Sequence, residues 1–83
     1  MSVTSAQCRA ARGLLDWTQT KLSESAKVSL STVKGFEGGR SAPVLQNLAA
    51  IRAALEAAGV EFIDENGGGA GVRFKKAQKK PGR

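Results

Sequence analysis

The 83 residues can form one small domain, and a hydrophobic fraction of 41% is sufficient for a thin core. The net charge is +6, and the chain has one cysteine and no histidine. This composition excludes an intrachain disulfide, a zinc site of the usual ligands and a nucleophile activated by histidine. We therefore expect no metal and no cofactor. Because the carboxylates are scattered among lysines and offer no paired acid and base, we also expect no enzymatic activity.

No apolar run approaches the roughly 20 residues needed to cross a bilayer. Residues 1–7 also lack the basic start and apolar stretch of a signal peptide, so we expect a soluble, cytoplasmic protein. The charge is unevenly distributed: residues 1–58 carry +3, residues 59–71 carry −3 and residues 72–83 carry +6. Two basic blocks around an acidic segment suit contact with a polyanion, although a surface that only keeps the protein in solution has the same pattern.

The first helix is predicted to begin after Thr4, whose hydroxyl can cap it while Gln7 reaches back in a capping box. Four residues at helical spacing give this helix an apolar face: Cys8, Ala11, Leu14 and Leu15. Arg9 and Arg12 fall on the other side, facing solvent or a partner. On the apolar face, Cys8 is more typical of a small core residue than of a redox sensor.

Two short helices are predicted next. One follows Thr18 as its cap and covers residues 19–26; the other follows Ser29 as its cap and ends at Gly38–Gly39. Their inward residues are Leu22, Ala26, Val33 and Phe36. Two capped helices separated by only two or three residues must cross steeply, which is the geometry of a helix-turn-helix. Trp17, between the first two helices, is interpreted as a core residue rather than one that stacks on DNA.

A fourth helix follows Pro43 and ends at Gly59. It is predicted from an apolar stripe of Leu45, Leu48, Ile51, Leu55 and Ala58. Residues 60–64 and 72–74 alternate as strands do, which predicts a β-hairpin that packs on the helices or pairs with another chain. The turn at 65–71 contains Gly67–Gly69, which lacks the Lys-Ser/Thr of a phosphate-binding loop and indicates a flexible turn.

These elements predict a mostly α fold: a compact four-helix domain at 1–58, a β-hairpin at 59–74 for packing or dimerisation, and a disordered basic tail at 75–83. The tail is either a solvated terminus or an arm on a DNA backbone.

The segment 19–37, QTKLSESAKVSLSTVKGFE, has small residues, Ser23 and Ala26, where two helices would touch. With Trp17-Thr18-Gln19 before it and Glu-Gly-Gly-Arg at 37–40, it resembles the Cro/C1-type (XRE-like) helix-turn-helix family of transcriptional regulators. The resemblance covers residues 5–58 and implies a compact domain of the lambda-repressor-like type.

The resemblance also implies that the third helix enters the major groove of DNA. The implied base contacts are Ser29, Leu30, Ser31 and Lys34. The implied phosphate contacts are Gln19, Thr32, Arg40 and Asn47. It further implies a homodimer that represses transcription from a palindromic operator in double-stranded DNA, with half-sites about 34 Å apart. The alternative is a protein-interaction module, such as an antiactivator, that uses the same scaffold to bind another regulator.

Three positions depart from the family pattern. Lys27 stands where the turn usually has glycine, so we expect a left-handed lysine that costs roughly 1–2 kcal/mol. Gly35 replaces a long polar side chain, which removes one base contact. Val44 stands where a serine often caps the fourth helix, and Ser41 or Ala42 would be poorer caps.

Overall fold

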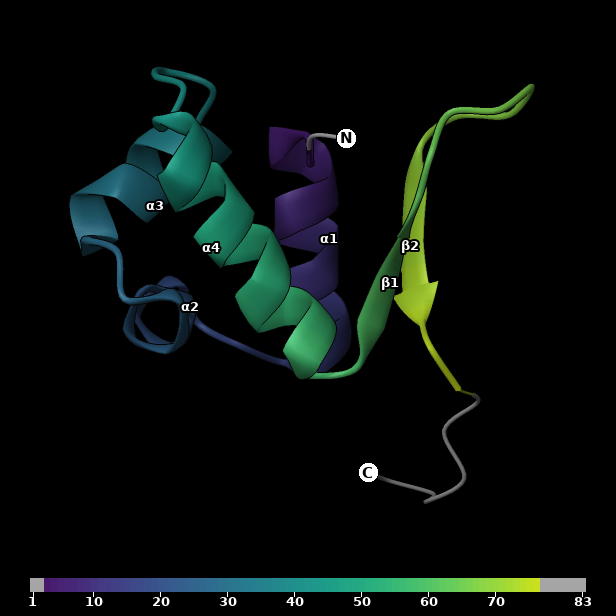
Figure 1. Cartoon of the computed structure of the whole chain (residues 1–83), viewed down its shortest axis with the longest axis horizontal. Helices are drawn as coiled ribbons and strands as arrows, with labels where there is room; N and C mark the ends of the chain where they lie inside the picture. The colour runs from purple at the N-terminus through teal and green to yellow at the C-terminus, as the bar shows by residue number, and fades with distance from the viewer. Residues whose placement is uncertain (1–2, 77–83) are drawn as a thin grey trace.

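The computed structural model describes residues 3–76 and contains four helices followed by a small antiparallel sheet (Figure 1). The elements are α1 (Ser5–Leu15), α2 (Gln19–Ala26), α3 (Leu30–Glu37), α4 (Leu45–Ala57), β1 (Val60–Ile63) and β2 (Gly71–Phe74). The predicted mostly helical fold with a C-terminal hairpin is confirmed, although the strands begin or end one residue from their predicted bounds. Between residues 3 and 76, no helix combines the length and apolar character needed to span a bilayer.

Polar caps begin the first three helices, as the sequence predicts. The Gln7 N–H donates to Thr4 Oγ1, and the Thr4 N–H donates to Gln7 Oε1, each at 3.0 Å. Thr18 and Ser29 likewise accept from the backbone N–H three residues further on. Helix α4 begins after Val44 with no side-chain cap. Each cap satisfies a backbone donor that has no partner within its helix, which favours a helix beginning at that residue.

Helices α2 and α3 are joined by Lys27–Ser29. Lys27 has the predicted left-handed backbone, with φ 61° and ψ 41°. Its N–H donates to the Ser23 carbonyl and closes the end of α2. The chain then leaves at a steep angle: Figure 1 views α2 nearly along its axis, whereas α3 lies across the view.

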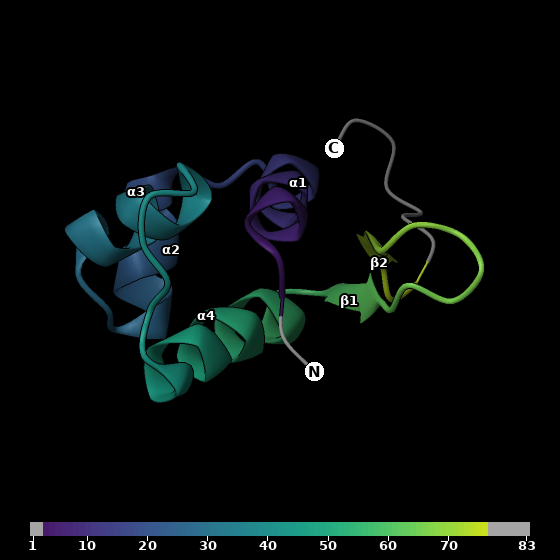
Figure 2. The ribbon, with the colours of Figure 1, turned by 90° about the horizontal axis from the view of Figure 1, so that it is seen from above.

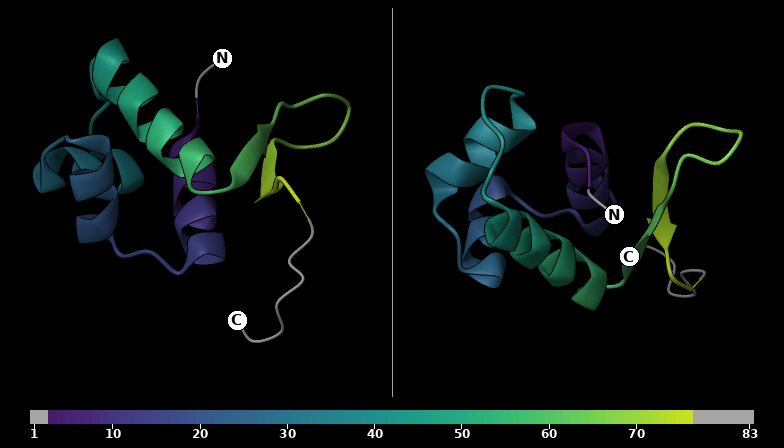
Figure 3. Two further views of the ribbon diagram at one scale, coloured as in Figure 1. Left: turned by 60° about the horizontal axis from the view of Figure 1, so that its bottom comes forward. Right: turned by 45° about the horizontal axis from the view of Figure 1, so that its top comes forward.

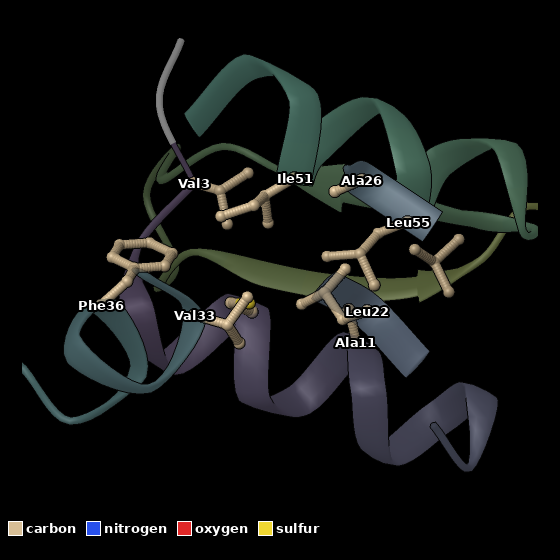
Figure 4. Packing of buried hydrophobic residues seen from close by; sticks show 10 residues of the cluster. Val3, Ala11, Leu22, Ala26, Val33, Phe36, Ile51 and Leu55 are labelled. Carbon is tan, nitrogen blue, oxygen red and sulfur yellow. The ribbon is translucent and has the colours of Figure 1, made fainter. Parts of the chain in front are cut away.

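The apolar core lies between the helices and the hairpin, and Figure 4 shows its members from close by. All four predicted inward residues of α2 and α3 are buried: Leu22, Ala26, Val33 and Phe36. Ile51 and Leu55 of α4 are fully buried. Val3 and Val60, which the sequence does not single out, extend this core into the N-terminal segment and β1. Burial of one such side chain contributes about 1.5–3 kcal/mol.

Three residues predicted to lie on the inward apolar faces of their helices are exposed instead. Leu45, expected in the inward stripe of α4, is 80% exposed. At 3.6 residues per turn, its side chain points about 100° away from the mean direction of Ile51 and Leu55. Ala58 is exposed because it lies beyond the end of α4, and Leu14 is exposed near the end of α1. Trp17 is half-buried against the core, as interpreted from the sequence.

The hairpin packs on α1 and α4, as Figure 3 shows from two sides. Its register pairs Val60 with Phe74 and Ile63 with Gly71. The Gln7 side-chain amide donates to the carbonyls of Ile63 and Gly71, at 3.3 and 2.9 Å, and so fastens α1 to the end of the hairpin next to its turn.

The predicted disordered tail starts at residue 75, and its first residue is paired with the chain before β1. The Lys75 N–H donates to the Gly59 carbonyl at 2.9 Å, which continues the strand pairing beyond β2. Residues 77–83 of the predicted tail lie outside the described residues.

Candidate nucleic-acid interface

A buried carboxylate holds the C-terminal end of α3. Glu37 is 3% exposed. Arg12 of α1 donates to it in a bidentate pair, from Nε to Oε2 at 2.8 Å and from Nη2 to Oε1 at 2.7 Å. Gln19 of α2 donates from Nε2 to Oε1 at 3.0 Å, and the Cys8 thiol donates to Oε2 at 3.1 Å. One side chain of α3 therefore connects α3 to both α1 and α2.

These contacts determine which groups are charged. Burial alone would raise the pKa of Glu37, but the hydrogen bonds from Arg12, Gln19 and Cys8 together hold that pKa below its usual value. The hydrogen bond to Glu37 raises the pKa of Arg12. Burial, and then the hydrogen bond to Glu37, raises the pKa of the Cys8 thiol. Glu37 and Arg12 are therefore ionised at neutral pH, while Cys8 is a protonated and unreactive thiol.

The structure corrects the expectation that Arg12 faces solvent or a partner. Besides its pair with Glu37, Arg12 donates from Nη1 to the Trp17 carbonyl at 2.8 Å, which fastens the segment between α1 and α2. The side chain keeps only 20% of its surface exposed. Arg12 is thus a structural cation, and its charge is matched by that of Glu37.

A groove of about 350 Å³ adjoins this ion pair. It is lined by Arg9, Arg12, Gln19, Lys34, Glu37, Gly38 and Arg40, which come from α1, α2, α3 and the residues directly after α3. Because Arg12 and Glu37 neutralise each other, the groove has three further cations: Arg9, Lys34 and Arg40. Such a concentration of positive charge attracts polyanions and raises their local concentration.

Two of these cations are held over the end of α3. Arg9 donates from Nη1 to the Glu37 carbonyl at 2.6 Å, which leaves its other N–H groups free to bind a ligand. The Arg40 guanidinium folds over Gly38, where an added Cβ would come within 2.6 Å of Arg40 Nη1. Among residues 3–76, the side chains of Lys34 and Arg40 form no ion pair or hydrogen bond with another residue.

The other end of α3 presents hydroxyl groups. The Ser29 hydroxyl caps the helix and lies 2.8 Å from Thr32 Oγ1 and 3.2 Å from Ser31 Oγ. Ser31 is exposed, whereas Leu30 and Thr32 are half-buried. Ser31 and Lys34 are three residues apart and therefore lie on one face of the helix. This exposed face continues from the hydroxyl groups into the basic groove.

Of the residues implied as DNA contacts, the structure gathers three, Gln19, Lys34 and Arg40, in the basic groove. Ser29, Leu30, Ser31 and Thr32 lie at the opposite end of α3. Asn47 is in the first turn of α4 and does not line the groove.

Sequence reasoning missed the buried role of Glu37. It lies four residues after Val33, so helical spacing places it on the inner face of α3, but its charge suggests solvent exposure. Gly35, which departs from the family pattern, is buried, and the loss of a base contact there stays a prediction. A Cβ there would meet Ser41 Oγ at 2.6 Å. Glycine at this position allows the chain after α3 to pass close to the helix.

The residues from 3 to 76 contain no group of three or more His, Cys, Asp and Glu side chains placed to hold a metal ion. The sequence was also compared with models of known families and with curated proteins, and it matches none of them.

Proposed function

We propose that the chain is a sequence-specific DNA-binding regulator of the Cro/C1-type helix-turn-helix kind, with α3 inserted in the major groove. The observation that supports this is the position of Arg9, Lys34 and Arg40 beside the exposed face of α3. Phosphate contacts from basic side chains supply most of the non-specific affinity for DNA. Phosphate contacts also fix the orientation of the protein on the duplex, which brings polar side chains on α3 within reach of base edges.

The exposed face of α3 has side chains suited to reading bases. Lys34 donates to O6 or N7 of guanine, Ser31 pairs with several base edges, and Leu30 contacts a thymine methyl group. Ser29 and Thr32 share the helix cap, so a DNA contact by either hydroxyl would be made in addition to the capping bond. In this proposal Ser29 contacts a base and Thr32 a phosphate.

The groove supplies the phosphate contacts. Gln19 and Arg40 act here, and the structure adds Arg9 because it lines the same groove. The first N–H groups of α2 favour an anion near Gln19. Asn47 is a further phosphate contact on α4. In this arrangement the Arg12–Glu37 pair orients Gln19 and α3 without binding DNA itself.

The proposed regulator acts as a homodimer that represses transcription by occupying a palindromic operator. One helix of eight residues buries too little surface for tight, specific binding, and two-fold pairing doubles the contact.

Duplexes selected from genomic DNA, and scrambled copies of them, test the base contacts by fluorescence anisotropy. Lys34→Ala and Ser31→Ala should weaken binding to the selected duplex roughly 5- to 150-fold more than binding to its scrambled copy, since a good base contact contributes about 1–3 kcal/mol of discrimination. Equal losses on both duplexes would contradict the assigned roles.

The groove is tested by the dependence of affinity on salt. Arg40→Ala and Arg9→Ala should weaken binding to every duplex and reduce the slope of log K against log salt by about 1 each. Arg73→Ala, on the exposed hairpin and outside the groove, is the matched control for loss of one positive charge. A shallow slope in the unchanged protein would favour the protein-interaction module instead.

A further inference from the structure

The outer face of α4 is apolar and exposed. Leu45 is 80% exposed and Val44 is 62% exposed, whereas most large apolar side chains are buried or half-buried. A groove of about 330 Å³ runs along this face, lined chiefly by Leu45, Leu48, Ala49 and Ala53. An apolar surface of this kind on a small protein marks a contact site.

This face is also the electrically neutral part of a strongly basic chain. Residues 41–58 include only two charged side chains, Arg52 and Glu56. They pair with each other from Nε to Oε2 at 3.0 Å, one helical turn apart. In a two-fold interface each patch meets its own copy, so two neutral segments do not repel each other, whereas two basic grooves or two acidic segments 59–71 would.

We propose that the outer face of α4 docks a second copy of this chain, with α4 packed against its counterpart around a two-fold axis. A two-fold interface brings one patch against itself, so the patch must complement its own charge and shape. A neutral apolar face meets the first condition. The exposed alanines, Ala49 and Ala53, meet the second, because small side chains allow two helices to approach closely.

The proposed interface leaves the basic groove open. Figure 2 shows α4 along one side of the molecule and α1 and α3 along the other. No residue of α4 lines the basic groove. A dimer formed through α4 can therefore bind DNA with both copies. This use of the dimer rests on the proposed function, whereas the interface itself does not.

The size of the face predicts a weak dimer in solution. Thirteen residues of helix are about 20 Å long, which is short for an interface of roughly 800 Å² per partner. Dimerisation should therefore depend on protein concentration in the micromolar to millimolar range. When two copies bind one duplex, their effective concentration rises, and we expect nearly all of the bound protein to be dimeric.

Sedimentation equilibrium of the full chain tests the inference. The unchanged protein should dimerise as its concentration rises, and Ala49→Glu should weaken the dimer at least tenfold by placing charge in the apolar face. Ala70→Glu, the same change in the exposed turn of the hairpin, should leave the dimer intact. A protein that stays monomeric both in solution and on a duplex with two half-sites would overturn the inference, as would an Ala49→Glu variant that dimerises normally.

A cross-linking variant tests the face without adding a charge. Ala49→Cys and Ala53→Cys should form disulfide-linked dimers under mild oxidation, whereas Ala70→Cys should not. The natural Cys8 is buried and should not contribute. Equal cross-linking at all three positions would overturn the assigned face.

Single half-site duplexes separate this inference from the proposed function. Ala49→Glu should bind one half-site as the unchanged protein does and lose only cooperative binding to two. If no duplex is bound but the dimer responds to Ala49→Glu, the DNA-binding function fails and the interface stands. If half-sites are bound but Ala49→Glu changes nothing, the interface fails and the function stands.

Discussion

Glu37 shows how one buried charge organises the site. Its four hydrogen bonds come from α1 and α2, so its position fixes where the end of α3 lies against the other two helices. Isolated buried charges are strongly unfavourable, and this one is accommodated because every bond neutralises or solvates it. The geometry of the basic groove depends on the same contacts, since Arg9 binds the Glu37 carbonyl.

Glu37→Gln should lower the free energy of unfolding by about 2–3 kcal/mol, because it leaves the Arg12 guanidinium without a counter-charge. The decrease in the free energy of unfolding should be smaller than for a fully buried ion pair, since the Arg12 side chain retains 20% of its surface exposed. Urea denaturation measures it. Glu61→Gln is the control: its pair with Arg73 is largely exposed and should contribute less than about 1 kcal/mol. Equal losses would contradict the structural role of Glu37.

The lowered pKa of Glu37 predicts an acid-dependent stability. An unfolded glutamate titrates near pH ~4.3, and the folded pKa lies below this value. The contribution of Glu37 is therefore complete above the unfolded pKa and is lost as pH falls through the folded one. The stability difference between the unchanged protein and Glu37→Gln should shrink on acidification from pH 6 to pH 2. A constant difference over that range would contradict the assignment.

At the scale of elements, the turn between α2 and α3 sets the direction of the DNA-reading helix in our proposal. Lys27 adopts a left-handed backbone that favours glycine, and φ of 61° places its Cβ unfavourably. The chain keeps this conformation because Lys27 and Val28 both donate to the Ser23 carbonyl and the flanking helices pack in the core.

Lys27→Gly should be more stable than Lys27→Ala by about 1 kcal/mol, since the two variants differ by a single Cβ in the left-handed position. The alanine variant controls for loss of the lysine charge. Thermal unfolding followed by circular dichroism measures both. A glycine variant no more stable than the alanine variant would show that the turn carries no strain.

The elements were predictable from sequence where their causes are local. Thr4, Thr18 and Ser29 cap their helices because a cap involves residues only three positions apart. Burial at the ends of elements was not predictable: Leu45 matches an apolar stripe but turns away from the core, while Val60 is buried by packing against α1 and α4.

The candidate site was only partly predictable for the same reason. The family resemblance singled out Gln19, Lys34 and Arg40, which the structure places around one groove. The pairing of Arg12 with Glu37 joins residues 25 positions apart, and no local pattern indicates it. Arg9 joins the groove because α1 packs beside the end of α3, where Arg9 binds the Glu37 carbonyl.

At the scale of the whole molecule, charge divides the surface between two tasks in our proposals. The basic groove gathers the cations of three segments beside α3, and the outer face of α4 remains neutral. The hairpin lies to one side and shares the core through Val60. This separation allows one small domain to contact DNA and a second copy together.

Titration of the isotope-labelled protein with DNA, followed by backbone amide NMR, tests whether α3 contacts bases while the basic groove binds phosphates. A selected duplex should shift the amides of residues 30–34 together with those of Arg9, Gln19 and Arg40. A scrambled duplex should shift mainly the last three, since phosphate contacts do not depend on sequence. Amides of Ser31 and Lys34 that stayed unshifted with every duplex, in a protein that remained folded, would contradict a DNA-reading role of α3.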